Sequence, residues 1–254
     1  MRPKQPLRHE LKYLLRREQV GPLLDDLRER LRVDDHGDAR GVYPITSLYY
    51  DAPAFKAYWD KIDGQRNRRK VRVRVYDPID VTPETPCFLE VKQRIDRMMS
   101  KRRVVLPYAG AVDFDAFPNL AAARPGPDGD LLQEVYYLYR TLQLRPTCVV
   151  TYDRMAFEGD AYAPDLRVTL DTLVTGRTHD LSLVSGDRAA NRVALGPEYA
   201  VLEVKANDNV PGWLANLLAR HHCTFRRIGK YCLVLETCQA VAARRHIFVA
   251  GNNT

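Results

Sequence analysis

The chain has 254 residues, and 39 Lys and Arg against 32 Asp and Glu give a formal net charge of +7. Hydrophobic residues make up 45% and charged residues 28%, which suits a folded globular protein and excludes global disorder. No run approaches the roughly 20 apolar residues of a membrane-spanning helix, and the charged first ten residues lack the apolar core of a secretory signal. We therefore expect a soluble, cytoplasmic protein, with one domain over residues 1–240 and a tail over 241–254.

Five cysteines, at positions 87, 148, 223, 232 and 238, form no C-x-x-C motif. An odd number in a chain of this size favours reduced thiols. The run 221–223, His-His-Cys, has no second ligand pair at finger-like spacing, which disfavours a structural metal there. The basic excess instead suggests an anionic partner, and nucleic acid, an anionic membrane or phosphate compounds would each satisfy it.

Six short segments alternate apolar and polar residues with the period of two that is typical of β-strands. In chain order they span residues 8–12, 71–75, 88–92, 150–154, 166–171 and 201–205. A sheet with one solvated face would explain any single segment. Taken together, however, their polar faces carry mainly Arg and Lys, with a lone Glu beside a Lys in three of the strands. The segments 89–92 and 202–205 both read Leu-Glu-Val-Lys and resemble a weak internal repeat.

Helical patterns lie between these strands. We expect one helix to begin at Pro22, a second to be capped by Asp130, and a third to begin at Pro211. The Gly- and Pro-rich residues 121–130 and 82–86 are expected to be loops. The apolar helix stripes would cover the outside of a sheet, so the pattern favours an α+β fold in which a β-barrel has a cationic interior.

If the polar faces converge, they form a cationic site. Its members would be Arg72, Arg74, Lys92, Lys101, Arg103, Arg154, Arg167, Lys205, Arg227 and Lys230. Like charges at such density are tolerated around a strongly anionic ligand. Arginine pairs bidentately with phosphate oxygens, and a linear phosphate chain matches a lined tunnel better than a single phosphate does.

Three carboxylates among these cations are metal candidates. Glu203 is the first, with Glu10 and Glu90 behind it, and a role as salt-bridge partners is the alternative for the last two. Magnesium typically takes one or two protein carboxylates together with phosphate oxygens and waters. The sequence contains no G-x-x-x-x-G-K-[ST], G-x-G-x-x-G, H-E-x-x-H or G-x-S-x-G motif.

Eight motifs in order make the chain similar to a known family. They occupy residues 8–13, 47–51, 72–74, 90–92, 152–154, 167–171, 202–205 and 227–231. Over about residues 6–238 the sequence resembles the VTC domain, the polyphosphate polymerase member of the triphosphate tunnel metalloenzymes (CYTH-like superfamily). The resemblance implies an eight-stranded antiparallel β tunnel flanked by helices. It also implies transfer of the γ-phosphate of ATP to polyphosphate with Mn²⁺ or Mg²⁺.

The same resemblance implies residue roles. The phosphate-binding set would be Lys12, Arg72, Arg74, Lys92, Lys101, Arg154, Arg167 and Lys230, to which Arg103, Lys205 and Arg227 are added. Within that set, the catalytic residues would be Arg72, Arg74, Lys92, Arg154, Arg167 and Lys230. Glu203 would be the metal ligand.

One position departs from related families. Triphosphatase and cyclase relatives carry Glu-x-Glu-x-Lys on the first strand, and here Arg8 stands at the first of these positions. The change removes a carboxylate and favours the polymerase branch. Hydrolysis of tripolyphosphate or a nucleoside triphosphate remains an alternative, as does polyphosphate binding without chemistry. Nucleic acid is disfavoured because the strand 71–75 carries no aromatic residue, although Tyr76 follows it; no protein partner is indicated.

Overall fold

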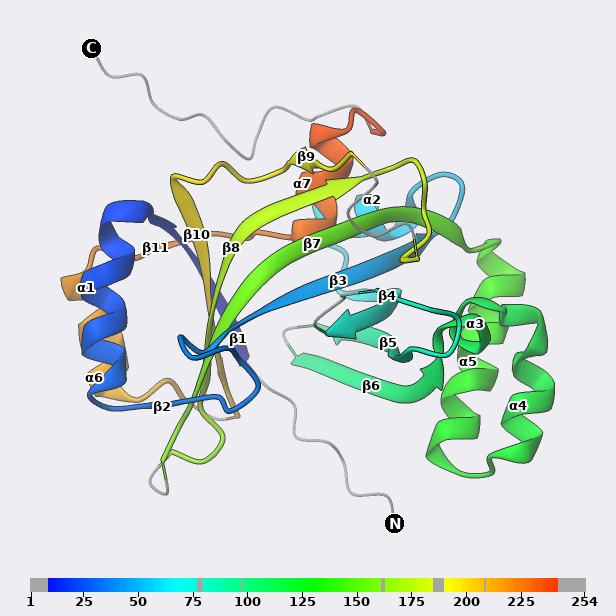
Figure 1. Ribbon diagram of the computed structural model, residues 1–254, viewed down its shortest axis with the longest axis horizontal. Helices are drawn as coiled ribbons and strands as arrows, with labels where there is room; N and C mark the ends of the chain where they lie inside the picture. The colour runs from blue at the N-terminus through cyan, green and yellow to red at the C-terminus, as the bar shows by residue number, and fades with distance from the viewer. Residues whose placement is uncertain are drawn as a thin grey trace.

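The computed structural model describes residues 9–76, 80–96, 98–160, 163–184, 190–207 and 209–241. These residues form one 11-stranded sheet together with helices on both of its faces (Figure 1). The strands are β1 (His9–Arg16), β2 (Arg32–Val33), β3 (Val42–Asp51), β4 (Asn67–Tyr76), β5 (Pro86–Ile95), β6 (Met98–Pro107), β7 (Arg145–Glu158), β8 (Arg167–Arg177), β9 (Arg192–Val193), β10 (Tyr199–Ala206) and β11 (Thr224–Phe225). The described residues of all six segments with period two therefore lie in strands, except Leu166, which directly precedes β8.

The strands are hydrogen-bonded in the order β11-β1-β10-β8-β7-β3-β4-β5-β6, with β2 on β7 and β9 on β8. All of these pairs are antiparallel. Within the described residues this path does not close, so the closed eight-stranded barrel is not confirmed. The sheet is nonetheless strongly curved, because Nζ of Lys92 on β5 lies 2.8 Å from the carboxylate of Glu10 on β1, near the opposite end of the strand order.

The helices cluster in three places. They are α1 (Arg17–Arg28), α2 (Lys56–Ile62), α3 (Tyr108–Val112), the 3₁₀ helix η1 (Phe114–Ala116), α4 (Phe117–Ala123), α5 (Pro127–Leu142), α6 (Gly212–Arg220) and α7 (Lys230–Thr237). Figure 1 shows α1 and α6 at one end of the molecule, α3 to α5 at the other, and α2 with α7 above the sheet. In the described part of the chain no helix is long and apolar enough to cross a membrane.

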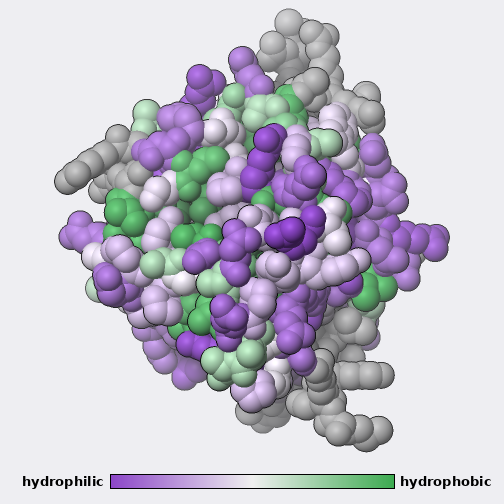
Figure 2. Space-filling model, turned by 90° about the vertical axis from the view of Figure 1, so that its right-hand side faces the viewer, coloured by the Kyte–Doolittle hydropathy of each residue, from purple (hydrophilic) through white to green (hydrophobic). Residues whose placement is uncertain are grey.

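Apolar strand residues pack against the two outer groups of helices. Leu27 of α1 and Leu214 of α6 are buried against Leu202 of β10, and complete burial of one such leucine contributes about 2 kcal/mol. At the other end, Leu132 of α5 packs with Val73 of β4. Figure 2 shows the side of the molecule where α4 and α5 lie, on which hydrophobic groups are separated by hydrophilic side chains.

Helix α7 packs on the opposite face of the sheet. Val234 and Tyr231 of α7 are buried with Cys148 and Val150 of β7. The hydroxyl of Tyr231 donates a hydrogen bond to Asp51. The carboxylate of Asp51 also accepts hydrogen bonds from the backbone N–H groups of Ala57 and Tyr58 in α2. This contact fixes the first turn of α7, where Lys230 lies.

The structure corrects three expected boundaries. The first helix begins at Arg17 rather than Pro22, which lies inside α1. The helix expected to start after Asp130 begins at Pro127, because proline is favoured in the first turn and Asp130 is already helical. The loop expected over 121–130 is therefore only the segment 124–126. The third helix follows Pro211 as expected.

Two expectations lie outside the described residues. The first concerns Arg8, which stands where triphosphatase and cyclase relatives carry a glutamate. The second concerns the tail expected over residues 241–254, of which residues 242–254 are not described. All five cysteines are free thiols, as the sequence predicts.

Candidate functional site

Charged side chains gather on the face of the sheet that the outer helices leave uncovered. On β4, Val71 and Val73 pack beneath the helices, so Arg72 and Arg74 point the other way, as strand alternation requires. We call this the inner face. Its charged residues with contacts to one another are Glu10, Lys12, Arg72, Glu90, Lys92, Lys101, Arg154, Asp171, Glu203, Lys205 and Lys230.

Lys12 is the centre of the first group. Its Nζ lies 3.0 Å from Glu10 and 3.2 Å from Glu203, while Lys92 and Lys205 pair with the same two carboxylates at 2.8 Å and 2.6 Å. The register explains the arrangement, because Glu10 faces Lys205 and Lys12 faces Glu203 across β1 and β10. Burial favours a higher pKa for Glu203, but the surrounding lysines outweigh it and hold that pKa well below its usual range.

Arg72 is the centre of the second group. Its Nε donates to Glu90 at 2.6 Å and its guanidinium also donates to the hydroxyl of Tyr49 at 2.9 Å. Lys101 of β6 lies 3.5 Å from the same Glu90. The pKa of Glu90 is low because Arg72, Arg74 and Lys101 outweigh the opposing effect of burial.

Arg74 connects this group to β7. Only 3% of Arg74 is exposed, and its guanidinium donates to Ser47 Oγ at 3.1 Å and to the hydroxyl of Tyr152 at 3.0 Å. Both acceptors are neutral. Arg74 therefore carries a buried charge that these hydrogen bonds do not neutralise.

Arg154 and Lys230 form the third group around Asp171. Arg154 binds Asp171 through two hydrogen bonds of 2.6 Å and 2.8 Å, and Lys230 binds the same carboxylate at 2.5 Å. Asp171 is completely buried. The two cations outweigh desolvation and lower its pKa to about 2. Nζ of Lys230 also lies 4.6 Å from the centre of the Tyr152 ring, a distance suited to a cation–π contact.

These groups form one continuous surface. Tyr152 joins the second and third groups, and Glu203 is close enough to Arg154 for the arginine to lower its pKa. Basic side chains outnumber the carboxylates, and several are largely withdrawn from water. Such an arrangement is costly without an anionic ligand, so the site is suited to binding a multiply charged anion.

Three predicted residues lie at the margins. Arg167 binds Asp34 and Glu158, although it also faces Lys205 across β8 and β10. Arg103 is exposed and lies over the ring of Phe88. Arg227 is exposed on the segment before α7, where its backbone carbonyl accepts a hydrogen bond from Lys61.

The predicted metal-binding carboxylates separate into two places. Glu10 and Glu203 converge on the position of Lys12 Nζ, whereas Glu90 is held by Arg72. Thr169 faces Glu203 across the strands, and its buried Oγ1 makes no hydrogen bond among the described residues. Hard oxygen donors of this kind fit Mg²⁺ or Mn²⁺. In the described part of the chain no three His, Cys, Asp or Glu residues converge, so phosphate oxygens or waters would have to complete the coordination.

Sequence reasoning missed several members of the site. Asp171 shares a strand face with Arg167 and Thr169, which the alternation does indicate, but its function as the shared partner of two cations depends on where α7 packs. Tyr152 and Ser47 lie within recognised motifs. Their hydrogen bonds to Arg74 depend on how β3, β4 and β7 pair.

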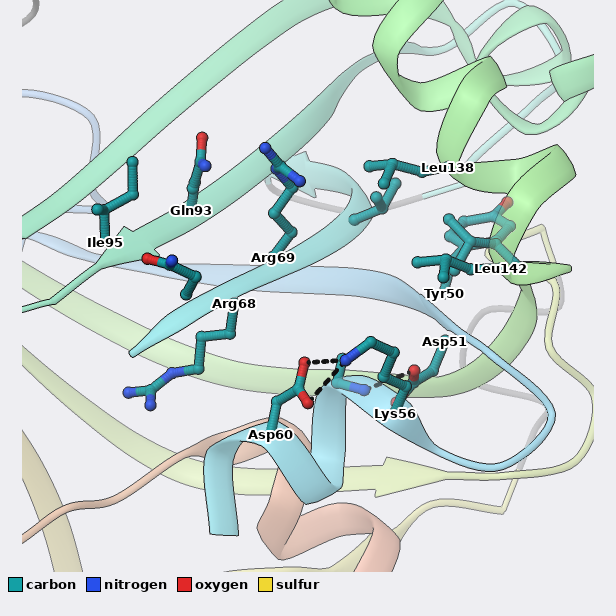
Figure 3. A pocket seen from close by; sticks show the side chains of 14 residues that line it. Tyr50, Asp51, Lys56, Asp60, Arg68, Arg69, Gln93, Ile95, Leu138 and Leu142 are labelled. Carbon is teal, nitrogen blue, oxygen red and sulfur yellow. Dashed lines mark hydrogen bonds and ion pairs between the residues drawn. The ribbon is translucent and has the colours of Figure 1, made fainter. Parts of the chain in front are cut away.

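A separate pocket of about 350 Å³ lies between α2, α5 and the ends of β4 and β5 (Figure 3). Gln93 and Ile95 line it, and they alternate along β5 with Lys92 of the inner face. Residues at odd and even positions of one strand point to opposite faces. The pocket therefore lies mainly on the outer face of the sheet, although Arg68, which also lines it, has the same strand parity as Arg72 and Arg74.

The family model for the VTC domain matches residues 7–238 of this chain. No curated protein matches its sequence. Several solved structures resemble it at low sequence identity, among them the following three. A protein from Pyrococcus horikoshii OT3 is 14% identical with a TM-score of 0.45, covering 90% of this chain and 98% of that one.

A candidate adenylate cyclase from Vibrio parahaemolyticus is 11% identical with a TM-score of 0.44, covering 89% of this chain and 97% of that one. A candidate adenylyl cyclase from Hippeastrum, described as having a dominant triphosphatase activity, is 13% identical with a TM-score of 0.44. The match covers 88% of this chain and 91% of that one.

Proposed function

Because this chain belongs to the VTC domain family, we propose that it is a cytoplasmic, metal-dependent phosphotransferase that moves the γ-phosphate of ATP onto a polyphosphate chain. The observation that carries the proposal is the inner face, where basic side chains outnumber carboxylates and Arg74 and Arg154 are buried. Arginine matches phosphate oxygens bidentately, and cations on several strands suit a linear phosphate chain. We further propose that the curved sheet encloses this chain as an eight-stranded tunnel.

The proposed reaction needs no nucleophilic side chain. A terminal oxygen of the acceptor phosphate attacks the γ-phosphorus, the bond from that phosphorus to the β–γ bridging oxygen breaks, and ADP leaves with the electron pair. Positive side chains stabilise the charge on the transferring group. The proposed contributors are Arg72, Arg74, Lys92, Arg154, Arg167 and Lys230.

Glu203, with Glu10 beside it, would hold Mn²⁺ or Mg²⁺. The ion would neutralise phosphate oxygens and orient them for in-line attack. Lys12 lies between the two carboxylates, so it would have to move aside or pair with a phosphate oxygen instead. Glu90 would stay engaged with Arg72 and keep that guanidinium in place.

The direct test is to incubate the purified chain with ATP and Mn²⁺ and to size any phosphate polymer on a gel. Chains longer than the substrate would support the phosphotransferase. Orthophosphate as the sole product would instead identify a triphosphatase, in which water is the acceptor.

A third outcome would be tight, metal-independent binding of polyphosphate without turnover. One observation favours this non-catalytic alternative: both carboxylate oxygens of Glu203 already have lysine partners. Binding assays with and without EDTA separate it from the two enzymatic functions.

A further inference from the structure

Aromatic side chains meet on the inner face where β4 ends and β5 begins. The rings of Tyr76 and Phe88 lie 5.4 Å apart in an edge-to-face arrangement, and the ring of Tyr43 lies 6.1 Å from that of Tyr76. Tyr43 is buried, whereas Tyr76 and Phe88 are partly exposed. One side of the aromatic cluster is therefore buried, and the other side is accessible to solvent.

Guanidinium groups flank the accessible rings. The guanidinium carbon of Arg103 lies 4.7 Å from the centre of the Phe88 ring, and that of Arg74 lies 5.7 Å from the Tyr76 ring. Val105 faces Phe88 across β5 and β6 and is 49% exposed. The Phe88 ring thus lies between the exposed Val105 and the guanidinium group of Arg103. Packing in the hydrophobic core alone does not account for this position.

This cluster adjoins the cationic site. Phe88 and Glu90 point to the same face of β5 and are two residues apart, a separation of about 7 Å. Arg74 faces Phe88 in the strand register and binds Ser47 and Tyr152 within the site. One end of a phosphate chain on this site would therefore lie beside Tyr76 and Phe88, within reach of a group attached to that end.

We infer that Tyr76, Phe88 and Arg103 form a subsite for the nucleobase of a nucleoside triphosphate. Planar bases stack on aromatic rings and on guanidinium groups, and such stacking accepts every base because each has a π-face. The inference rests on the proposed function and deepens it, because it names the side chains that would hold the base of the ATP donor and predicts that they do not select among bases. Since stacking does not read hydrogen-bonding edges, ATP and GTP are expected to bind similarly.

Calorimetric titration of the full chain with ATP and with tripolyphosphate, both with Mg²⁺, tests the subsite. Tripolyphosphate has the phosphate chain without the base. Phe88→Ala is expected to lower the ratio of ATP affinity to tripolyphosphate affinity about tenfold, and Phe88→Trp is expected to restore it. Phe225→Ala is the matched control, because Phe225 is also half-exposed and edge-on to a tyrosine but lies on β11, at the other end of the strand order.

An unchanged ratio in Phe88→Ala would overturn the subsite while leaving the proposed function standing, provided that the wild type binds tripolyphosphate. If Phe88→Ala does not fold, Phe88→Leu keeps apolar volume without an aromatic face and is expected to show the same fall in the ratio. A wild-type chain that binds neither ligand would overturn the proposed function and the subsite together.

Discussion

Asp171 shows how a single residue can decide whether the cationic site is stable. It is completely buried, and its carboxylate is shared by Arg154 and Lys230. Both cations are themselves largely withdrawn from water, so each depends on this partner. Removing one member of such a buried ion cluster leaves uncompensated charge, which costs more than the original contacts contribute.

We therefore predict that Asp171→Asn lowers the free energy of unfolding by about 3–5 kcal/mol. Urea denaturation of the two proteins measures the difference. Asp25→Asn is a suitable control, because the Asp25 side chain is 77% exposed and surface changes stay within about 0.5 kcal/mol. Equal effects of the two substitutions would contradict the importance of the buried cluster.

Glu203 is the buried carboxylate that the proposed function assigns to the metal ion. Glu203→Gln keeps the size of the side chain but removes one negative charge next to Lys12 and Lys205. We predict that it abolishes metal-dependent turnover and leaves the fold intact. Circular dichroism checks the fold, and product formation at several Mn²⁺ concentrations checks the turnover. Wild-type turnover in this variant would refute the assignment of Glu203 as a metal ligand.

At the scale of elements, α7 determines where Lys230 lies. The helix approaches β8 closely at Gly176, where an added Cβ would lie 2.4 Å from the carbonyl oxygen of Val149 and 2.6 Å from the side chain of Val234. The backbone oxygen belongs to the neighbouring strand and has little freedom to move. The glycine therefore permits both the pairing of β7 with β8 and the packing of α7.

Gly176→Ala is accordingly expected to lower the free energy of unfolding by about 1–3 kcal/mol and to weaken tripolyphosphate binding, because Lys230 shifts with α7. Thermal unfolding and calorimetric titration measure the two effects. Gly110→Ala provides the matched control, since a Cβ there meets no atom within 4 Å. Tripolyphosphate binding and stability of Gly176→Ala equal to those of the control would show that α7 does not depend on the close approach at Gly176.

The elements also show what the sequence could predict. The alternation of apolar and polar residues identified the strands and the face of each strand that carries charge. It could do so because the alternation of side chains between the two faces is a local property of the extended backbone. Pro22 was misleading as a helix start, because packing of Leu23 and Leu27 stabilises α1 despite one missing backbone hydrogen bond. Ion pairs between distant strands, such as Lys92 with Glu10, depend on sheet curvature, which no local pattern encodes.

At the scale of the whole molecule, the inner carboxylates link stability to pH. Glu10, Glu90, Glu203 and Asp171 all have a lowered pKa in the folded chain because nearby cations outweigh the effect of burial. In the unfolded chain these groups would bind protons at higher pH. Their contribution to stability is thus fully present above the ordinary carboxyl range, about pH 4, and is lost as the pH falls through the folded values.

We predict that the free energy of unfolding falls as the pH drops from about 4 toward about 2, the value to which the pKa of Asp171 is lowered. Urea denaturation across this range gives the slope, and Asp171→Asn should show a shallower one because it lacks one of the linked groups. A wild-type stability that stays constant down to pH 3 would show that the carboxylates are not paired as described.

The central claim is that the inner face binds a linear phosphate chain. A crystal structure of the chain with tripolyphosphate and Mn²⁺ tests it most directly. We expect phosphate oxygens within hydrogen-bonding distance of Arg72, Arg74, Arg154 and Lys230, and electron density for Mn²⁺ beside Glu203. Tripolyphosphate bound elsewhere on the surface, with the inner cations still paired only to their carboxylates, would contradict it.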